Sequence, residues 1–336
     1  MGKIDLKNLK EDNLIEGLNG KKVVIYGSND CGKTYQSTKF DKPLLLMTES
    51  GGSALKCKKV SITKWSEFKD VVDTLTNSKT YAEMFDLYQT IIIDTAENLV
   101  SLSEQSVANE YGVRDLSEIT GKQNGWKIAR TDFSMQINKL TSVGYFVICI
   151  MHEETIEKID EVTKETYQYF QPKNYDNPKS SMRFLVDDFD YVIFTRPNGI
   201  DTETYETIPS TAICKRTKTN FARSRFKIKT FIDPFTADEL KSAIIDSVEK
   251  SAKEEGVGIE KYKNKKQKWT KKDYFDLIAP YIKRLSKTFA NDISTIVETE
   301  LGSGRKITSA TDDELINLDN IYNRLVTLAT SLDITV

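Results

Sequence analysis

The sequence is poor in the side chains from which many metal and nuclease sites are built. Its 336 residues contain one histidine, His152, and four cysteines, none of them in a CxxC pair. Zinc sites that need several histidines, and HNH-type nuclease sites, are therefore excluded. Widely spaced cysteines without a pairing pattern favour a reduced, cytoplasmic protein.

Long apolar runs and a strong net charge are absent as well. No apolar run reaches the roughly 18 residues of a membrane span and the first residues are polar, so we expect neither a membrane partner nor a secretory signal. The formal net charge is -2. Any nucleic-acid binding must therefore come from local basic patches rather than from a field over the whole protein.

What is present is a series of short apolar runs typical of buried strands. They lie at 22–27, 43–49, 88–97, 145–153, 190–196 and 210–216. Stretches with helical spacing, such as 65–76 and 130–143, separate some of them. Continuous apolar runs suit strands that are covered on both faces. The alternation predicts an α/β fold with a mostly parallel sheet.

The composition changes along the chain and suggests four parts. We expect a polar lead-in, a large core, a closing helix with a basic linker, and a small helical domain, at 1–20, 21–235, 236–272 and 273–336. In the last part Thr311 precedes Glu314 with the spacing of a capping box, which predicts the start of the final helix.

The stretch GSNDCGKT fits the phosphate-binding loop pattern GxxxxGK[ST], and it follows an apolar strand and precedes a helical stretch. Glycines let main-chain amides approach a phosphate, and the next helix points its positive end at it. Lys33 would contact the β and γ phosphates, and Thr34 would ligate Mg²⁺. The expected nucleotide-binding set is Gly27, Ser28, Asn29, Asp30, Cys31, Gly32, Lys33, Thr34 and Tyr35.

Carboxylates that would complete this site follow two other apolar runs. Asp94 ends TIIID and would hold Mg²⁺ together with Thr34. Hydrolysis also needs a group that orients or deprotonates water. Glu49, expected on a strand beside the P-loop strand, is the preferred candidate, and Glu97 is the alternative. Otherwise Glu97 is a charge stabilised in the first turn of a helix.

Together the P-loop, LLLMTES with Glu49, IIIDTAENL with Asp94 and VICIMHEE with His152 resemble the RecA-fold ATPases. They are most similar to the phage-encoded, RecA/RadA-like AAA_24 group, over roughly residues 20–235. Some members of that group are recombination or single-strand annealing proteins that work with single-stranded-DNA-binding protein. The resemblance implies a RecA-like core, with ATP and Mg²⁺ as cofactors, acting on single-stranded DNA in the cytoplasm of a phage-infected bacterium.

The resemblance also assigns roles to individual residues. Glu49 matches the family's catalytic glutamate. His152 matches the Gln or His that ends the fourth strand, senses the γ-phosphate and signals to a DNA-binding loop. Arg216 and Lys218 match basic residues that reach the ATP of a neighbouring subunit, which would require a homo-oligomer. The alternative for this pair is a solvated basic edge strand.

Three segments mix aromatic and basic residues in a way that suits single-stranded DNA. The first is the loop after His152, the second the region 110–130, and the third the linker 261–272, which is otherwise a flexible tether. Their candidate contacts are Tyr167, Tyr169, Phe170, Lys173, Lys179 and Arg183; Arg114, Lys122, Trp126 and Lys127; and Tyr262 and Trp269.

The preferred function is a DNA-stimulated ATPase in recombination or single-strand annealing. A hexameric, replicative-helicase-like ATPase and a nucleotide-binding adaptor for a single-stranded-DNA-binding protein stay open. The absence of an NKxD guanine signature favours ATP over GTP. No Gly-rich DNA loop and no N-terminal polymerisation helix are recognisable, so the sequence does not distinguish a ring from a filament.

Overall fold

The chain forms two compact units with separate hydrophobic cores. The computed structural model describes residues 13–49, 55–77, 80–119, 124–177, 180–262, 271–286, 288–332 and 334. The larger unit comprises residues 1–76 and 80–264, and the smaller one residues 77–79 and 265–336. Lys122, Lys179, Trp269 and most of the predicted basic linker lie outside the described residues.

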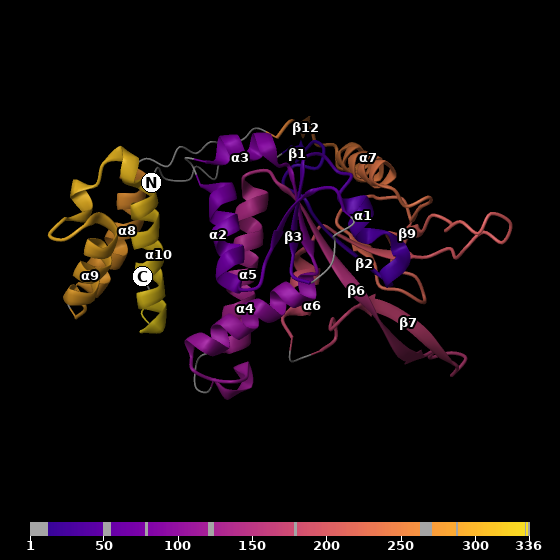
Figure 1. The fold of residues 1–336 in the computed structure, drawn as a ribbon, viewed down its shortest axis with the longest axis horizontal. Coiled ribbons are helices and arrows are strands. Elements are labelled where there is room, and N and C mark those ends of the chain that lie inside the picture. The colour runs from indigo at the N-terminus through magenta and orange to yellow at the C-terminus, as the bar shows by residue number, and fades with distance from the viewer. Residues whose placement is uncertain are drawn as a thin grey trace. The chain divides into compact units, whose positions relative to one another are not determined.

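The larger unit is built on a sheet with the strand order β11-β9-β8-β2-β6-β5-β3-β4 (Figure 1). Every neighbouring pair from β8 to β4 is parallel, whereas β7, β9, β10 and β11 add antiparallel pairings. The predicted α/β fold with a mostly parallel sheet is thus confirmed. The strands, including the separate pair β1 and β12, are β1 (Leu14–Ile15), β2 (Lys22–Gly27), β3 (Pro43–Met47), β4 (Lys58–Ser61), β5 (Thr90–Asp94), β6 (Phe146–Ile159), β7 (Thr166–Pro172), β8 (Tyr191–Arg196), β9 (Thr211–Ile213), β10 (Arg223–Ser224), β11 (Phe231–Ile232) and β12 (Ile259–Glu260).

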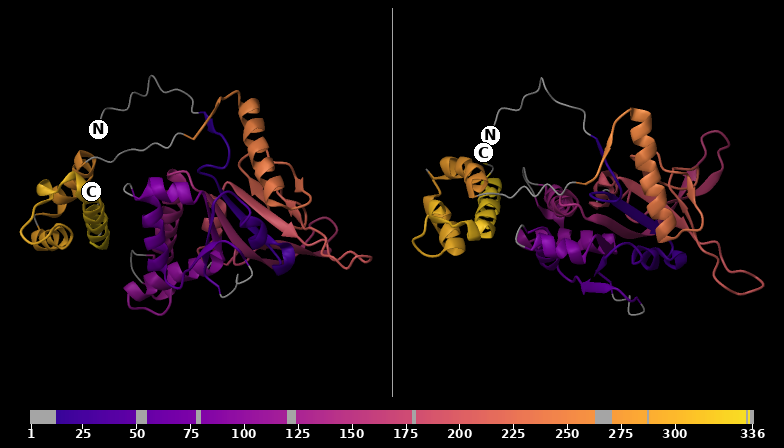
Figure 2. Two further views of the ribbon diagram at one scale, coloured as in Figure 1. Left: turned by 45° about the horizontal axis from the view of Figure 1, so that its top comes forward. Right: turned by 90° about the horizontal axis from the view of Figure 1, so that it is seen from above.

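Helices cover both faces of this sheet, as Figures 1 and 2 show. The helices α2, α4, α5 and α6 pack on one face, and α7 packs on the other. The helices of the larger unit are α1 (Lys33–Ser37), α2 (Trp65–Thr76), α3 (Tyr81–Leu87), α4 (Ala96–Glu110), α5 (Gly125–Ser142), α6 (Met182–Asp188) and α7 (Ala237–Glu255).

The sequence of β2 shows why the strands lie in the centre. All six of its residues are buried. Side chains alternate across a strand, so Val23 and Ile25 enter the core beneath α7 while Val24 and Tyr26 enter the opposite core. A strand of this kind loses its apolar contacts if either layer of helices is removed, which fixes it inside a three-layer fold.

Two details of the sheet correct expectations from the sequence. The predicted strand 145–153 continues to Ile159 and turns back as β7, so the stretch after His152 is a β-hairpin rather than a loop. The alternating side chains of 153–159 allow this pairing. In addition, β3 is not beside the P-loop strand β2, because β6 and β5 lie between them.

The smaller unit is a helical bundle. It contains α8 (Lys271–Leu285), α9 (Ala290–Leu301) and α10 (Leu315–Ser331) around an apolar cluster that includes Ile278, Val297 and Leu325. The predicted capping box is present, because the main-chain N–H of Thr311 donates to Glu314 Oε2 at 2.8 Å. It lies in a short 3-10 turn (Asp312–Glu314) that leads directly into α10.

Among the described residues, no helix is both long enough and apolar enough to cross a membrane.

The central strands should dominate the stability of the larger unit. Ile92 of β5 has 0% exposed surface, so Ile92→Ala should lower the free energy of unfolding by about 2–5 kcal/mol through lost transfer energy and a cavity. Chemical denaturation would measure this. Met135→Ala, at a side chain that is 47% exposed on α5, is the control and should change stability little. An equal loss in both variants would contradict the central position of β5.

Candidate nucleotide-binding site

The carboxyl ends of three adjacent parallel strands bring the predicted site residues together. Gly27 ends β2 and is paired in register with His152 of β6, and Asp94 ends β5 on the other side of β6. Ligands of open parallel sheets bind at this edge. Strand register alone therefore collects residues that are far apart in the sequence.

The P-loop begins where two strands approach closely. A Cβ on Gly27 would lie 2.2 Å from the carbonyl oxygen of Thr195 on β8, so no other residue fits this backbone. Gly32 has φ 71°, a left-handed conformation that favours glycine, and it joins the 3-10 turn Asn29–Cys31 to α1. Both glycines of the motif are thus explained by geometry.

The remaining P-loop residues differ in accessibility. Cys31 is buried, and its Sγ lies 3.3 Å from Thr195 O, so this side chain packs the loop against β8. Asn29 and Asp30 are exposed. Tyr35 is 53% exposed on α1, with the Lys39 ammonium 4.5 Å from its ring centre. The helix α1 has only five residues, so a phosphate would depend on the loop amides and Lys33 more than on a helix dipole.

Lys33 is buried at the mouth of the loop. Its ammonium donates to the carbonyl oxygens of Gly27 and Ser28 at 2.8 and 2.5 Å. Burial lowers the pKa of Lys33, and the nearby carboxylates of Asp94, Glu153 and Glu97 counter this effect. A buried ammonium surrounded by acids is placed to contact an anion that enters the same space.

Thr34 and Asp94 meet across the mouth of the loop. The Thr34 hydroxyl donates to Asp94 Oδ2 at 2.8 Å. Burial raises the pKa of Asp94, and the carboxylates of Glu49 and Glu97 raise it further, while the Thr34 hydroxyl and Lys33 oppose the shift. A hydroxyl and a carboxylate that converge in a negatively charged setting are the oxygen ligands that Mg²⁺ prefers, so these two residues fit the metal.

Glu49 lies beside Asp94 even though its strand is not adjacent to β2. Its Oε1 accepts hydrogen bonds from the Thr95 hydroxyl at 3.1 Å and from Asn98 Nδ2 at 2.9 Å. Its side chain is otherwise exposed. The residue that sequence analysis preferred is therefore held by the segment that follows β5, with a carboxylate oxygen open to solvent.

Glu97 is engaged differently. It is 5% exposed, and its Oε1 accepts from the main-chain N–H of His152 at 3.0 Å and lies 2.5 Å from His152 Nδ1. This carboxylate therefore fixes both the backbone and the ring of His152. The sequence offered Glu97 only as a second candidate for activating water or as a helix charge, and gave no sign of this contact.

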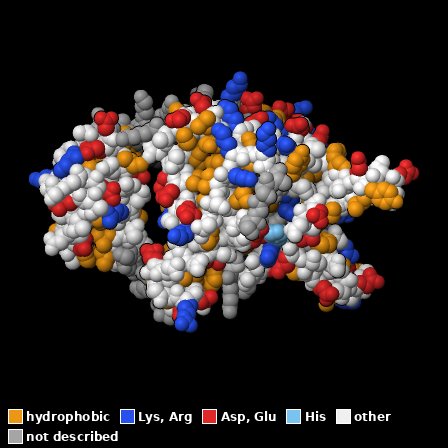
Figure 3. All heavy atoms as spheres, in the orientation of Figure 1, with side chains coloured by type: hydrophobic (Ala, Val, Ile, Leu, Met, Phe, Trp, Pro, Cys, Tyr) orange, Lys and Arg blue, Asp and Glu red, His pale blue; other side chains and the backbone are white. Residues whose placement is uncertain are grey.

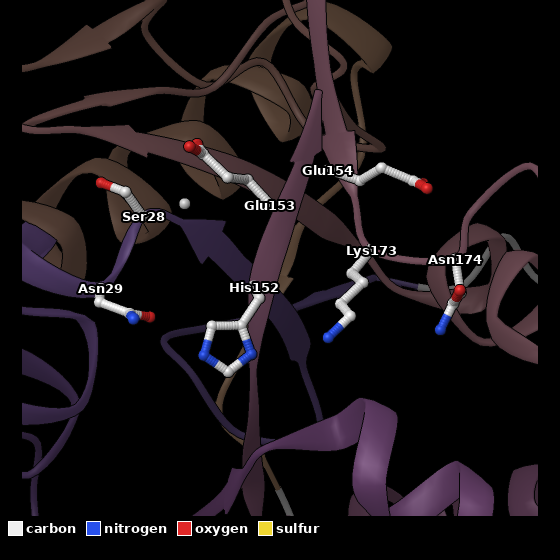
Figure 4. A pocket seen from close by; sticks show the side chains of 8 residues that line it. Ser28, Asn29, His152, Glu153, Glu154, Lys173 and Asn174 are labelled. Carbon is white, nitrogen blue, oxygen red and sulfur yellow. The ribbon is translucent and has the colours of Figure 1, made fainter. Parts of the chain in front are cut away.

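A pocket of about 440 Å³ opens beside the P-loop, lined by Gly27, Ser28, Asn29, His152, Glu153, Glu154, Lys173 and Asn174. Figure 4 shows the His152 ring and the Lys173 ammonium side by side at this pocket. The main-chain N–H of Lys173 donates to His152 O at 3.0 Å, which ties the end of β7 to the site. Sequence analysis considered Lys173 only for DNA contact, although the structure places it at the pocket.

Arg216 and Lys218 lie on the segment after β9. The Lys218 ammonium forms an ion pair with Asp160 at 2.5 Å within the same chain, and this contact lowers the pKa of Asp160. The Arg216 guanidinium lies 4.8 Å from the Phe221 ring centre, is exposed, and forms no ion pair with the described residues. Of the two, Arg216 is the one whose charge is available.

Several aromatic residues considered for DNA contact belong to apolar clusters instead. Tyr169 is 5% exposed, and Phe170 and Tyr167 pack partly buried against the same core. Trp126 packs against a small cluster that includes Val107 and Leu116. The basic candidates Lys127 on α5, Arg183 on α6 and Arg114 are all exposed.

The Thr34–Asp94 pair gives a direct test of metal binding. Asp94→Asn keeps the shape but removes the negative charge, so Mg²⁺-dependent nucleotide affinity should fall about tenfold or more. Calorimetric titration with ATP, with Mg²⁺ or with EDTA, would measure it. Thr34→Ser keeps the hydroxyl and is the control. The pKa of Asp94 is raised, so as the pH falls Asp94 should be protonated at a pH above the ordinary aspartate pKa of about 3.9. The effect of Mg²⁺ on nucleotide affinity should be lost in the same pH range. A Mg²⁺ effect unchanged in the Asn variant would contradict the assignment.

Comparison with known proteins agrees with this geometry. The AAA domain family AAA_24 matches residues 19–226, which include the P-loop, Asp94 and His152. The SPbeta prophage-derived uncharacterized protein YorG of Bacillus subtilis (strain 168) is 33% identical over 316 residues, covering 91% of this chain and 92% of that protein. An AAA domain binds ATP, which is what the P-loop and its carboxylates are suited to do. The chain therefore belongs to the AAA_24 family of AAA-domain proteins.

Proposed function

We propose that this protein hydrolyses ATP and uses the energy to act on single-stranded DNA in phage recombination or annealing. The observation that carries the ATPase part is the 2.8 Å contact between the Thr34 hydroxyl and Asp94 at the mouth of the P-loop, beside buried Lys33. Recombination or annealing is supported by the resemblance to RecA-like ATPases and by the prophage origin of YorG.

In the proposed reaction, water attacks the γ-phosphate in line with the leaving ADP oxygen. Lys33 would turn its ammonium from the loop carbonyls to the β and γ phosphates, and Thr34 and Asp94 would hold the metal. Mg²⁺ would supply positive charge that neutralises the phosphate oxygens. Glu49 positions the water, because its carboxylate is fixed by Thr95 and Asn98 and is still accessible to solvent.

His152 would report the state of the γ-phosphate. Its ring lines the pocket beside Asn29 of the P-loop, and Glu97 holds it from behind. The same strand continues as the β6–β7 hairpin, and Lys173 at the end of β7 is hydrogen-bonded to the His152 carbonyl. A shift of His152 would therefore move the hairpin with it.

Arg216 would complete the site of a neighbouring subunit in a homo-oligomer, a ring or a filament. Its segment is joined to the hairpin, because Phe170 N–H donates to Thr219 O and Phe221 N–H donates to Phe170 O, both at 2.8 Å. Lys218 is better suited to holding this segment through Asp160. An arginine supplied in this way can raise phosphoryl-transfer rates by about 10³–10⁵.

The first test is ATP turnover with and without single-stranded DNA. We expect DNA to stimulate wild-type turnover, and Lys33→Ala to reduce turnover at least about a hundredfold, because the charge on the transferred phosphate loses its partner. Phosphate release measures both. Lys39→Ala, two residues after the end of α1 and outside the motif, is the matched control. Equal rates with and without DNA would contradict the DNA role, and ATP bound without turnover would indicate a nucleotide-binding adaptor.

A second test separates the sensor from the catalytic groups. Glu97→Gln removes the charge that holds His152, so stimulation by single-stranded DNA should fall more than turnover without DNA. Glu104→Gln is the matched control, since Glu104 lies on the same helix and accepts from Ser181 N–H at 2.8 Å away from the pocket lining. A parallel loss of both activities in Glu97→Gln would show that Glu97 acts in hydrolysis rather than through His152.

A further inference from the structure

Two hairpins that leave the nucleotide edge of the sheet end in the same turn. The β6–β7 hairpin turns through Ile-Asp-Glu-Val-Thr-Lys-Glu-Thr at 159–166, and the β8–β9 connection turns through Ile-Asp-Thr-Glu-Thr-Tyr-Glu-Thr at 200–207. The strands β6 and β8 flank β2 on its two sides. The repeated turns therefore project from both neighbours of the P-loop strand (Figure 1).

The hydrogen bonds of the two turns match one for one. Oδ1 of Asp160 accepts from the N–H groups of residues 162 and 163 at 2.9 Å, and Oδ1 of Asp201 accepts from those of residues 203 and 204 at 2.9 and 2.8 Å. Lys164 and Tyr205 hold the same left-handed position, with φ 63° and 57°. Such side-chain bonds make each tip a preformed turn.

Both preformed tips present apolar side chains to solvent. Ile159 and Val162 are 66% and 88% exposed, and Ile200 and Tyr205 are 62% and 81% exposed. These are the four most exposed of the large hydrophobic residues described. Exposed apolar groups on a rigid, protruding support are typical of contact sites for another protein.

The second tip is strongly acidic, and the first carries four acidic residues against two lysines, Lys158 and Lys164, between residues 157 and 165. Glu157, Glu161 and Glu165 are exposed near the first tip, and Glu203 and Glu206 near the second. Between Pro197 and Pro209 there is no basic residue. In Figure 3 the arm that extends farthest to the right carries hydrophobic and acidic atoms at its end and no blue ones. These charges disfavour phosphate and favour a basic protein surface.

The same chain offers such a surface at the opposite edge of its sheet. The edge strand β4 is exposed along its whole length and, among the described strands, pairs only with β3. Lys56 and Lys58 are exposed there, Val60 is 37% exposed, and no acidic residue occurs between residues 55 and 66. Its charge and apolar content thus complement those of the tips.

We infer that the hairpin tips of one subunit dock on the β4 edge of a second copy of this chain. Such a contact uses different surfaces on the two subunits and so repeats head to tail, forming a ring or a filament. The inference rests on the proposed function only for the use of Arg216 between subunits. The docking itself requires neither hydrolysis nor DNA.

The test uses two variants of the full chain and a mixture of them. A tip variant, Ile200→Ser with Tyr205→Asn, keeps a residue that tolerates positive φ. An edge variant carries Lys56→Glu and Lys58→Glu. Measured by sedimentation velocity, the self-association affinity of each variant alone should be about tenfold or more below that of wild type, with and without Mg-ATP. Mixed together, they should form heterodimers and stop there, because one intact tip then meets one intact edge.

Two controls keep the outcome decisive. Met135→Ser, at an exposed site on α5 away from both surfaces, should assemble like wild type, and Val162→Ser should weaken assembly through the other tip. Nucleotide binding measured on every variant confirms folding and separates this test from the ATPase proposal, which fails only if wild type does not bind or turn over ATP. A wild type that stays monomeric at every concentration, tip or edge variants that assemble like wild type, or a mixture without heterodimers would each overturn the inference.

Discussion

The site depends on one electrostatic constraint: a single buried ammonium faces several carboxylates at the edge of a parallel sheet. Lys33 interacts electrostatically with Asp94, Glu97 and Glu153, and Asp94 interacts in the same way with Glu49. Hydrogen bonds to a carboxylate favour its charged form, and three of these four acids have such a partner. The Thr34 hydroxyl donates to Asp94, the Asn98 amide donates to Glu49, and the His152 ring is hydrogen-bonded to Glu97. The excess of negative charge is what a divalent cation would offset.

The same partners connect the site to the rest of the larger unit. Because Glu97 belongs to α4 and His152 to β6, their contact joins a helix of one layer to the central strand. That strand extends past the sheet as half of a hairpin, and the hairpin is fastened to the Arg216 segment through Asp160 and Lys218. The nucleotide edge and the protruding arms are therefore continuous in covalent and hydrogen-bonded structure.

The sequence predicted those parts of the molecule that local pattern controls. The P-loop, the buried strands and the Thr311–Glu314 cap follow from glycine positions, apolar runs and capping chemistry, and all were found as expected. The position of β3 was predicted wrongly, because strand order depends on long-range pairing that apolar runs do not encode. The hairpin after β6 was mistaken for a loop, since its alternating strands are polar on one side. Glu97 and His152 are 55 positions apart in the sequence, and Asp160 and Lys218 are 58 positions apart. Local sequence patterns do not predict contacts over such separations.

The close approach of Gly27 to Thr195 links two events that the sheet would otherwise keep apart. The first residue of the phosphate loop and the strand that carries the β8–β9 arm leave no room between them for a methyl group. If a second subunit docks on that arm as proposed, a displacement of β8 would be passed directly to the first residue of the phosphate loop. Assembly would then alter how readily nucleotide enters and leaves, so that exchange of ADP for ATP becomes a property of the oligomer rather than of each chain.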